Sequence, residues 1–500
     1  MIDTVRSKLF ASATVLLSLA CCDAGAVPSF ARQTGMDCTT CHMSWLELTN
    51  IGRRFKLGGY QLMKQMDDDA VRPLVTFRFD TPPPLIPLAG ALQLGITQTA
   101  RTKTPGTVTP NNANVAGGFG TDFPSQNEFV LQQMSLFLNG KIIDHVGCFC
   151  QFTYNSVGTT TSIDNFEIRA ADTRVFNNFV DKRFEVIYGL SLNDNPGMSD
   201  VWNTTPVFGW PYVGSQVNVA PIAAPIINQT LQTSAGGLTA YTLLDRTLYL
   251  EAGAYHQTDG AISFLHLNVP QGGRYQVDGL APYYRFAIQH DWDKGHQSIE
   301  FGTFGLQPKV WKPATAGNTI DAYGPSDEYL DRGYDAQYQY IYDKHRLSVM
   351  FTLEDEDQHY RNGTPDFGQG AANARDHLSY INTKVSYYYK KWYGGTLAFQ
   401  RTTGSPDAGL YAPAFNDATI SGGGASAVNG SHSGSPDTTA YIGELDYLFS
   451  TSGAQDHRKS RIILQYTAYK EFNGAGNNYA NNGRNASDNN YWWLGLWLMY

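Results

Sequence analysis

The sequence predicts an all-β chain, a transmembrane β-barrel of about sixteen strands preceded by a short N-terminal segment with different chemistry. Three observations predict it: a low content of charged residues, segments in which apolar and polar residues alternate, and connections that alternate between short and long. Of the 500 residues, 16% are charged and 13% are aromatic, whereas soluble globular proteins carry about 25% charged residues. No long apolar stretch follows the N-terminus, which excludes a helical membrane protein.

The N-terminus has the features of a cleaved signal peptide spanning residues 1–26. Arg6 and Lys8 precede a short apolar run at 9–20, and the small residues Ala24, Gly25 and Ala26 end the segment. This pattern directs export, and the run is too short to span a bilayer. Acylation at Cys21, as in a lipoprotein, is the alternative. The mature chain would begin at Val27 in an oxidising compartment.

Residues 38–42 read CTTCH, the spacing used for covalent haem attachment. Cys38 and Cys41 would form the thioether bonds, and His42 would be the axial ligand of the haem iron. A disulfide between cysteines at this spacing would be strained, and a zinc site would need a fourth ligand. The single motif predicts one haem c.

Strand segments show a period of two. In 331–343, Tyr334, Tyr338 and Tyr340 share one face, while Asp335 and Gln337 share the other. Such alternation suits a wall between lipid and a polar lumen, although a half-buried sheet of a soluble sandwich has the same period. The segments expected as strands are 89–101, 128–138, 141–155, 163–175, 182–192, 232–243, 246–256, 281–291, 296–306, 331–343, 345–355, 376–389, 392–402, 437–450, 459–470 and 489–500.

The connections predict the orientation of this barrel. Short turns are expected at Asn139 and Gly140, at 293–295 and at 343–344, with long connections at 193–231, 356–375 and 403–436 among others. Bacterial barrels place short turns in the periplasm and long loops outside the cell. The last strand, YWWLGLWLMY, places Trp492 and Leu494 on one face and is expected to close the barrel against the first strand.

Two stretches resemble a known family. The segment PSFARQTGMDCTTCHMSWLELTNIGRRFKLGGY and the stretch at 189–212 ending in WNTTPVFGWPY are similar to the fused monohaem cytochrome-porins, the outer-membrane iron-oxidising c-type cytochromes. The resemblance implies a signal peptide (1–26), a monohaem cytochrome c segment (27–87) and an outer-membrane, porin-like barrel (88–500). It carries haem attachment to Cys38, Cys41 and His42. The cytochrome segment is near the lower size limit for an independent domain, so we expect the barrel wall to complete its core as a plug.

The function implied is that of an oxidoreductase. It would oxidise extracellular Fe(II) and pass electrons to a periplasmic cytochrome or cupredoxin. A conduit for another extracellular donor or acceptor, and a solute porin with a haem-bearing plug, are the alternatives. The formal net charge of -9 is spread along the chain, so no basic surface for nucleic acid is expected, and outer-membrane lipid is the expected environment.

Further ligands are less clearly marked. A methionine as second axial ligand would raise the haem potential; Met63 leads and Met66 follows, with Met36, Met43 and His145 as competitors. In 353–360, five side chains offer oxygen or imidazole ligands to incoming Fe(II), with a solvated rim as the alternative: Glu354, Asp355, Glu356, Asp357 and His359. Asn165, Glu167 and Arg169 are expected to form a charge-paired constriction in the lumen.

Overall fold

The computed structural model describes residues 29–34, 36–44, 46–62, 88–101, 129–177, 183–228, 230–266, 275–311, 325–361, 371–411, 430–449, 460–481 and 483–499. The expected signal peptide lies outside these residues. So do the two leading axial candidates, Met63 and Met66.

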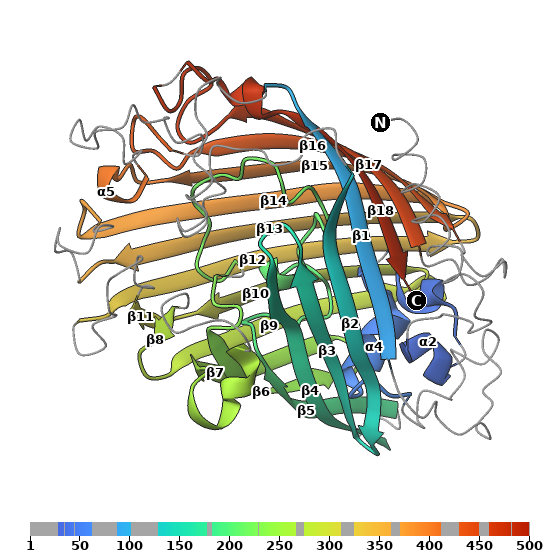
Figure 1. The fold of residues 1–500 in the computed structure, drawn as a ribbon. Helices are drawn as coiled ribbons and strands as arrows, with labels where there is room; N and C mark the ends of the chain where they lie inside the picture. Colours follow the sequence, from blue (N-terminus) through green and yellow to red (C-terminus); the bar gives the residue numbers. More distant parts are fainter. Residues whose placement is uncertain are drawn as a thin grey trace.

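The described chain forms one closed antiparallel sheet (Figure 1). The sheet has 18 strands, of which β8 and β11 are short side segments and the other sixteen form the wall. The wall strands are β1 (Leu88–Thr99), β2 (Val130–Ile143), β3 (Val146–Asn155), β4 (Thr160–Asn177), β5 (Arg183–Asn193), β6 (Ala235–Leu244), β7 (Leu248–Gln257), β9 (Ala281–Trp292), β10 (Gln297–Leu306), β12 (Asp327–Tyr342), β13 (His345–His359), β14 (Arg375–Tyr389), β15 (Tyr393–Gly404), β16 (Thr438–Phe449), β17 (Ser460–Glu471) and β18 (Tyr491–Met499). The side segments are β8 (Gln276–Val277) and β11 (Lys309–Trp311).

Pairing of the first and last strands closes the barrel. Ala91 pairs with Met499, and the register continues to Thr99 opposite Tyr491. The closure removes the free sheet edges that would otherwise expose unpaired backbone groups. The predicted all-β barrel of sixteen strands, closed by its C-terminal strand, is therefore confirmed.

The two faces of the wall differ as the alternation predicts. Tyr334 is 50% exposed on the outside, while Gln337 on the same strand is 2% exposed toward the inside. Large apolar side chains cover the outer face, including Leu190, Leu238, Phe301, Leu397, Leu445 and Leu494. A closed barrel with an apolar outer face is the structure of an outer-membrane protein, and the chain resides in the outer membrane. Within the described residues, no helix has the length and apolar character needed to cross a bilayer.

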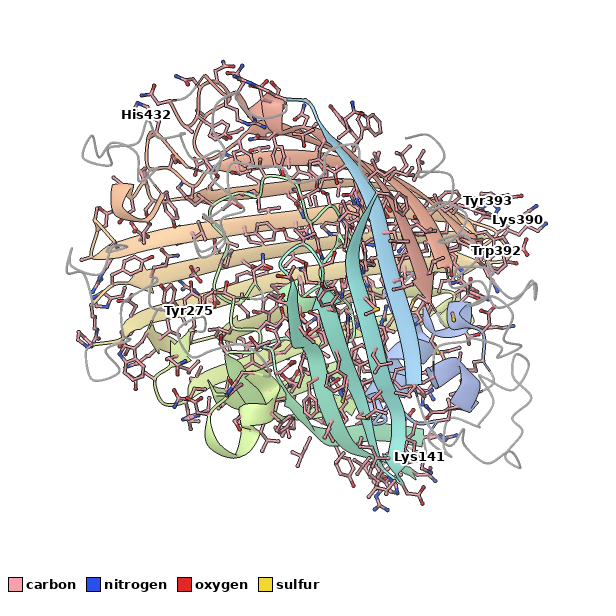
Figure 2. All side chains as sticks on the ribbon, viewed as in Figure 1. Lys141, Tyr275, Lys390, Trp392, Tyr393 and His432 are labelled. Carbon is pink, nitrogen blue, oxygen red and sulfur yellow. The ribbon has the colours of Figure 1, made fainter. Side chains whose placement is uncertain are left out.

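Short turns gather at one end of the barrel. They include 245–247, 293–295, 343–344 and 390–392. Figure 2 shows Lys390, Trp392 and Tyr393 toward this end, and Tyr275 and His432 toward the opposite end, where the long connections lie. One connection at the long-loop end, 156–159, is also short.

One predicted turn is misplaced. Asn139 and Gly140 are not a turn but lie within β2, where they pair with Phe149 and Cys148 of β3. The chain reverses four residues later, at Asp144 and His145. The Asn139 side chain accepts a hydrogen bond from the Cys150 backbone N–H at 3.0 Å, so the dipeptide stabilises the ladder instead of ending it.

A long connection between β5 and β6 folds into the barrel. We call residues 194–228 and 230–234 the inner loop; it runs through the interior in Figure 1. Its residues bind the lumen face of two neighbouring wall strands: Thr352 of β13 donates to the Thr204 carbonyl at 2.7 Å, and Asn382 of β14 donates to the Trp210 carbonyl at 2.6 Å. The sequence predicts that this connection is an outer loop, whereas the structure places it inside the lumen.

Among the residues described before β1, three short helices occur: α2 (Ser29–Thr34), α3 (Cys38–Cys41) and α4 (Asn50–Leu57). They lie at the short-turn end, where α2 and α4 appear beside β2 in Figure 1. The remaining helices belong to connections: α5 (Ala408–Tyr411), η2 (Pro206–Phe208), η3 (Gly260–His266), η5 (Asp293–Gly295) and η8 (Ala486–Asn489). Residues 29–62 are called the N-terminal segment below.

Candidate haem site

The CTTCH motif forms a single capped helical turn. The Asp37 side chain accepts a hydrogen bond from the Thr39 backbone N–H at 3.2 Å, which satisfies a donor at the start of α3. The His42 N–H donates to the Cys38 carbonyl at 2.9 Å and ends the turn. Cys38, Cys41 and His42 all line the same cavity. The local fold therefore brings the three predicted haem-binding residues together.

That cavity has an empty volume of about 890 Å³, which includes space open to solvent. The walls are mainly apolar and come from the N-terminal segment, from β3 and from the inner loop: Phe30, Leu46, Leu48, Phe55, Tyr60, Phe149 and Phe208. Phe30 stacks on Tyr60 with ring centroids 5.2 Å apart. A large planar, mostly apolar group fits such a lining.

The environment of His42 suits a metal ligand. Burial lowers the pKa of His42 to about 4. Backbone hydrogen bonds at Leu46 and Glu47 favour the protonated form, but their effect on the pKa is smaller than that of burial. The imidazole is therefore neutral at neutral pH, which is the form that binds iron. Backbone hydrogen bonds to an imidazole also fix its orientation.

Burial affects Cys41 in the opposite sense. It raises the pKa of the Cys41 thiol to about 12, with smaller contributions from Cys38 and Asp37. Cys41 is therefore a protonated thiol here. The two cysteines and His42 on one cavity are the donor set that c-type haem attachment requires, so the residues present fit the group.

Close helix packing supports the motif. The Thr49 side chain accepts from the Gly52 N–H at 3.3 Å to cap α4, and its hydroxyl donates to the Thr40 carbonyl at 2.7 Å. A Cβ on Gly52 would lie 2.2 Å from the Cys41 carbonyl oxygen. Only glycine allows α4 to approach α3 this closely.

Arginine 346 of the barrel wall binds the backbone of the motif. Arg346 donates to the His42 carbonyl at 2.8 Å and to the Thr39 carbonyl at 2.9 Å. Because these two carbonyls lie at the end of α3, the cation also stabilises the negative end of the helical turn. The wall strand β13 and the haem motif are thereby joined directly.

A buried ion pair joins the same two parts. Lys384 of β14 lies 2.7 Å from Glu47, and Glu47 also accepts hydrogen bonds from Ser348 and, at 2.9 Å, from Gln339. Burial opposes ionisation of Glu47, but Lys384 and these donors outweigh it and keep the pKa of Glu47 below its usual value. The carboxylate is therefore ionised and fully partnered.

Helix α4 is held by its three basic residues. Arg53 donates to Ser298 at 2.9 Å and to Gln339 at 2.6 Å. Arg54 pairs with Glu185 of β5, and Lys56 donates to the inner-loop carbonyls of Met198 and Asp200 at 2.7 and 2.8 Å. Helix α4 thus contacts the wall strands β5, β10 and β12 and the inner loop.

Two wall glycines make room for the N-terminal segment. A Cβ on Gly147 of β3 would lie 2.1 Å from the Gly59 carbonyl oxygen, and one on Gly140 of β2 would lie 2.2 Å from the Gln33 side chain. Gln33 donates to the Asn139 carbonyl at 2.8 Å. Gly140, which the sequence places in a turn, therefore allows the Gln33 side chain to lie close to β2.

The predicted constriction forms in part. Glu167 and Arg169 pair at 2.8 Å and are both fully buried. Tyr60 hydrogen-bonds Glu167, and Lys56 lies 3.8 Å from it, so this pair contacts the N-terminal segment. Asn165 instead hydrogen-bonds Gln151 at 2.9 Å.

The axial candidates fall in different places. Met36 is buried and lines the cavity, whereas Met43 is buried and is not among the lining residues. Met63 and Met66 lie outside the described residues. His145, expected on the lumen face of a strand, is in the turn at 144 and 145 with a side chain 59% exposed and 3.5 Å from Asp172. That expectation is wrong because the turn comes four residues later than predicted.

The five acidic-stretch candidates are divided between the two faces of β13. Glu354 and Glu356 are buried toward the lumen, and the alternation of the strand points Asp355, Asp357 and His359 outward. Asp357 pairs with Arg332 outside, and His359 lies 3.8 Å from Glu328. The structure therefore does not unite the five side chains, because adjacent strand residues face opposite ways.

Sequence reasoning missed Arg346, Lys384 and Glu47. Arg346 and Lys384 belong to wall strands, and each carries its charge on the lumen-facing side of its strand. Alternation alone could have placed these two charges inside the barrel, but it could not name their partner in the N-terminal segment.

No protein-family profile matches the chain, and no curated protein matches it. Among solved structures, the trimer form of OmpT, an outer membrane protein of Vibrio cholerae, is 8% identical, with 83% of this chain and 98% of that chain covered and a TM-score of 0.40. OmpF of Salmonella typhi in complex with daunomycin is 12% identical, with 83% and 97% covered and a TM-score of 0.39. The outer membrane channel DcaP of Acinetobacter baumannii is 10% identical, with 83% and 96% covered and a TM-score of 0.39. At these scores the likeness carries no argument, so the barrel assignment depends on the strand pairing described above.

Proposed function

We propose that this protein is an outer-membrane oxidoreductase that takes electrons from extracellular Fe(II) and passes them to a periplasmic cytochrome or cupredoxin. The observation that carries the proposal is the apolar cavity lined by Cys38, Cys41 and a neutral His42 at the short-turn end of a closed barrel. The proposed family, the fused monohaem cytochrome-porins, has this function.

Cys38 and Cys41 would hold one haem c through thioether bonds, and His42 would bind its iron. When bound, the haem supplies one-electron transfer chemistry. The aromatic lining gives the cavity mainly apolar walls, and Arg346 fixes the backbone of the motif. Met63 is proposed as the second axial ligand and Met66 as its substitute, while Met36 is the methionine that lines the described cavity.

The position of the site supports the direction of electron flow. Short turns mark the periplasmic end in bacterial barrels, and the N-terminal segment contacts strand residues beside those turns, such as Arg346 next to the turn at 343–344. A periplasmic acceptor can approach that end. Oxidising Fe(II) at the other end leaves the poorly soluble ferric product outside the cell.

Two alternatives share this architecture. A conduit for another extracellular donor or acceptor would use the same site. A solute porin with a haem-bearing plug is less well supported, because the inner loop and the N-terminal segment both bind lumen-facing side chains. Flux of small solutes through the intact protein in liposomes would favour the porin alternative.

Anaerobic mixing of the purified protein with Fe(II) at several pH values, followed through the haem absorption bands, tests the proposal. Rapid reduction of the haem is expected. A Cys38→Ser/Cys41→Ser variant should lose the haem stain of the denatured polypeptide while the barrel still folds. Failure of Fe(II) to reduce the wild-type haem at every pH would exclude iron oxidation, and an unchanged stain in the double variant would exclude covalent haem.

A further inference from the structure

Three carboxyl groups meet on the lumen face of the wall, away from the haem site. Asp331 of β12 lies directly opposite Glu356 of β13, and Glu354 is two residues along from Glu356 on the same face. Each of the three residues is 1% exposed. We call these residues the carboxylate triad. Its position, beyond the midpoint of β13, places it in the half of the barrel next to the long loops.

Glu354 has no compensating partner. Both of its carboxylate oxygens are buried without a hydrogen-bond donor in the described part of the chain. The charged group that acts on it is Glu356, which repels it. Glu354 is thus a fully buried carboxyl group aimed into a cluster of like groups.

The other two members of the triad differ in their polar contacts. Glu356 accepts from the Ile226 backbone N–H at 2.5 Å and from Gln358. Both carboxylate oxygens of Asp331 are buried without a hydrogen-bond donor in the described part of the chain, and Asp331 lies opposite Glu356 in the strand pair. A cation bound between them could supply the missing partner.

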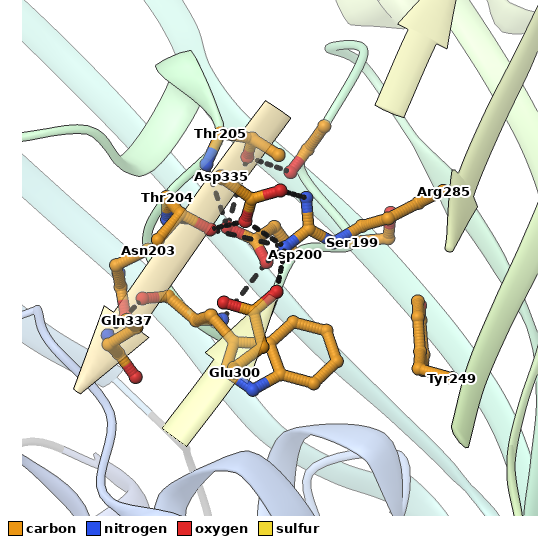
Figure 3. Close-up of polar contacts among 12 residues, drawn as sticks. Ser199, Asp200, Asn203, Thr204, Thr205, Tyr249, Arg285, Glu300, Asp335 and Gln337 are labelled. Carbon is orange, nitrogen blue, oxygen red and sulfur yellow. Dashed lines mark hydrogen bonds and ion pairs between the residues drawn. The ribbon is translucent and has the colours of Figure 1, made fainter. Parts of the chain in front are cut away.

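In a neighbouring acidic cluster, an arginine neutralises the buried carboxylates. Deeper in the lumen, Arg285 lies 3.2 Å from Asp200, 3.4 Å from Glu300 and 2.7 Å from Asp335. Figure 3 shows these four side chains close together. Asp335 is four residues from Asp331 along β12. The deeper cluster contains a permanent cation. The described residues supply no such cation to Glu354 or Asp331.

Burial of several carboxylates in a low-dielectric interior is unfavourable unless a positive charge accompanies them. Protons can supply it, and so can a metal cation. Carboxylate oxygens are hard donors that favour Mg²⁺, Mn²⁺, Fe²⁺ or Ca²⁺ over softer metals. We infer that Asp331, Glu354 and Glu356 form a binding site for a hard divalent cation inside the outer half of the lumen.

The site is not a preformed metal centre. Across the described ranges, no three Asp, Glu, His or Cys side chains already hold metal-binding geometry. A cation would be bound through water molecules or after rotation of the Glu354 and Glu356 side chains. This matches an ion that is held and released, in contrast to a structural metal with fixed ligands.

The site lies between the outside and the haem motif. Ser348, which contacts Glu47, and Glu354 are six residues apart on β13, a separation of about 20 Å at the rise of an extended strand. Fe(II) belongs to the class of cation that this site would bind. The identification of Fe(II) as the bound cation rests on the proposed function, whereas the cation site itself does not. The triad would then hold the substrate inside the barrel.

Binding of Mn(II) to the purified full-length protein in detergent tests the inference, because free Mn(II) is followed by electron paramagnetic resonance without involving the haem. The wild type should bind Mn(II) at one saturable site. Glu354→Gln combined with Asp331→Asn should weaken that binding at least about tenfold. The matched control is Asp355→Asn combined with Asp357→Asn, which removes two carboxylates from the outer face of the same strand and should leave the binding unchanged.

Three outcomes would overturn the inference. One is the absence of saturable Mn(II) binding by the wild type, which would mean that protons alone neutralise the triad. Another is equal binding by the wild type and the Glu354→Gln/Asp331→Asn variant, once heat-shifted gel mobility shows that the variant is folded. The third is loss of binding in the outer-face control.

The two proposals fail separately. If Mn(II) binds as expected but Fe(II) does not reduce the haem, the cation site stands and iron oxidation does not. If the wild type shows no saturable Mn(II) binding while Fe(II) still reduces the haem, the cation site is wrong and iron oxidation stands. If Fe(II) reduces the haem equally fast in the wild type and in a Glu354→Gln/Asp331→Asn variant that has lost Mn(II) binding, the triad binds cations but does not hold the Fe(II) that is oxidised.

Discussion

Lys384 and Glu47 form an ion pair in the lumen, where both side chains are buried. Removing one partner of such a pair leaves a buried, uncompensated charge, which typically costs about 3–5 kcal/mol. We therefore expect Lys384→Met to loosen the N-terminal segment from the wall. Limited proteolysis of the folded protein should cut within residues 29–62 faster than in the wild type.

Two controls accompany this prediction. Glu47→Gln added to Lys384→Met should restore much of the protection, since no charge is then left buried. Lys390→Met changes an exposed lysine in a nearby turn and should leave the cutting rate unchanged. Equal protection in Lys384→Met and the wild type would contradict a stabilising role for the pair.

Gly147 allows backbone contact between β3 and the N-terminal segment. Because the opposing atom at 2.1 Å is the Gly59 carbonyl oxygen, it cannot rotate away as a side chain could. Gly147→Ala should destabilise the docked segment by about 1–3 kcal/mol. Gly158→Ala, where a Cβ would meet Thr160 at an ordinary 3.5 Å, is the control. Denaturant titration of segment release should separate the two variants, and coincident curves would refute the assignment.

The second axial ligand can be tested through the haem potential. Thioether ligation raises this potential and a second imidazole lowers it. Met63→His should therefore retain the covalent haem, lower its potential and slow reduction by Fe(II), with Met66→His as the control. A redox titration measures the change. An unchanged potential in Met63→His would remove Met63 from the site, and Met36→Leu would then be the next variant to titrate.

At the scale of elements, Asp407 joins two connections at the long-loop end. Its carboxylate accepts from the backbone N–H groups of Ala372 at 3.0 Å, Asn373 at 2.8 Å and Leu410 at 2.9 Å. Burial works against the ionised form, but these donors outweigh it and hold the pKa of Asp407 below its usual value of 3.8. The stabilisation is thus present above pH 3.8 and is lost as the pH falls through the lower folded value.

We accordingly expect Asp407→Ala to release both connections at neutral pH. The loss of three backbone partners corresponds to about 1–3 kcal/mol of local stability. Hydrogen exchange of residues 371–373 and 408–411 should be faster in Asp407→Ala at neutral pH. In the wild type the same acceleration should begin only below the usual carboxyl range. Fast exchange in the wild type at pH 5 would contradict the prediction that the pKa of Asp407 is lower in the folded than in the unfolded protein.

Local pattern predicts the elements of the wall well. Alternation assigns Tyr334 to the lipid face and Asp335 to the lumen face, because a strand residue's side follows from its neighbours alone. The same rule, applied to 354–357, already divides the acidic stretch between two faces. The Asn139 and Gly140 turn is wrong because glycine marks a close approach as well as a reversal.

The inner loop lies beyond such reasoning. Thr204 and Asp200 are polar residues of the kind found in surface loops, and Trp210 precedes Pro211, a residue common in turns. Their partners Thr352, Arg285 and Asn382 lie far away along the chain. A pattern within the loop carries no information about these contacts, and the same holds for Glu47 and Lys384.

For the whole molecule, the arrangement of turns predicts the orientation in the membrane. Protease added to intact cells should cut the connection within 403–436, part of which lies outside the described residues, and should spare the turn at Asp144 and His145. A cleavage-site tag inserted at each position makes the two comparable. Cutting at the Asp144 and His145 tag alone would reverse the orientation and place the haem motif at the outer end.

The pairing of β1 with β18 has a consequence for biogenesis. The CTTCH motif shares its cavity with Phe149 of β3 and Phe208 of the inner loop, inside a wall that closes only when the two terminal strands meet. Under the proposed function, a maturation enzyme that joins haem to Cys38 and Cys41 needs access to both thiols. We therefore expect attachment to precede docking, so that the exported chain would carry its cofactor in the periplasm until the two terminal strands meet and close the cylinder around it.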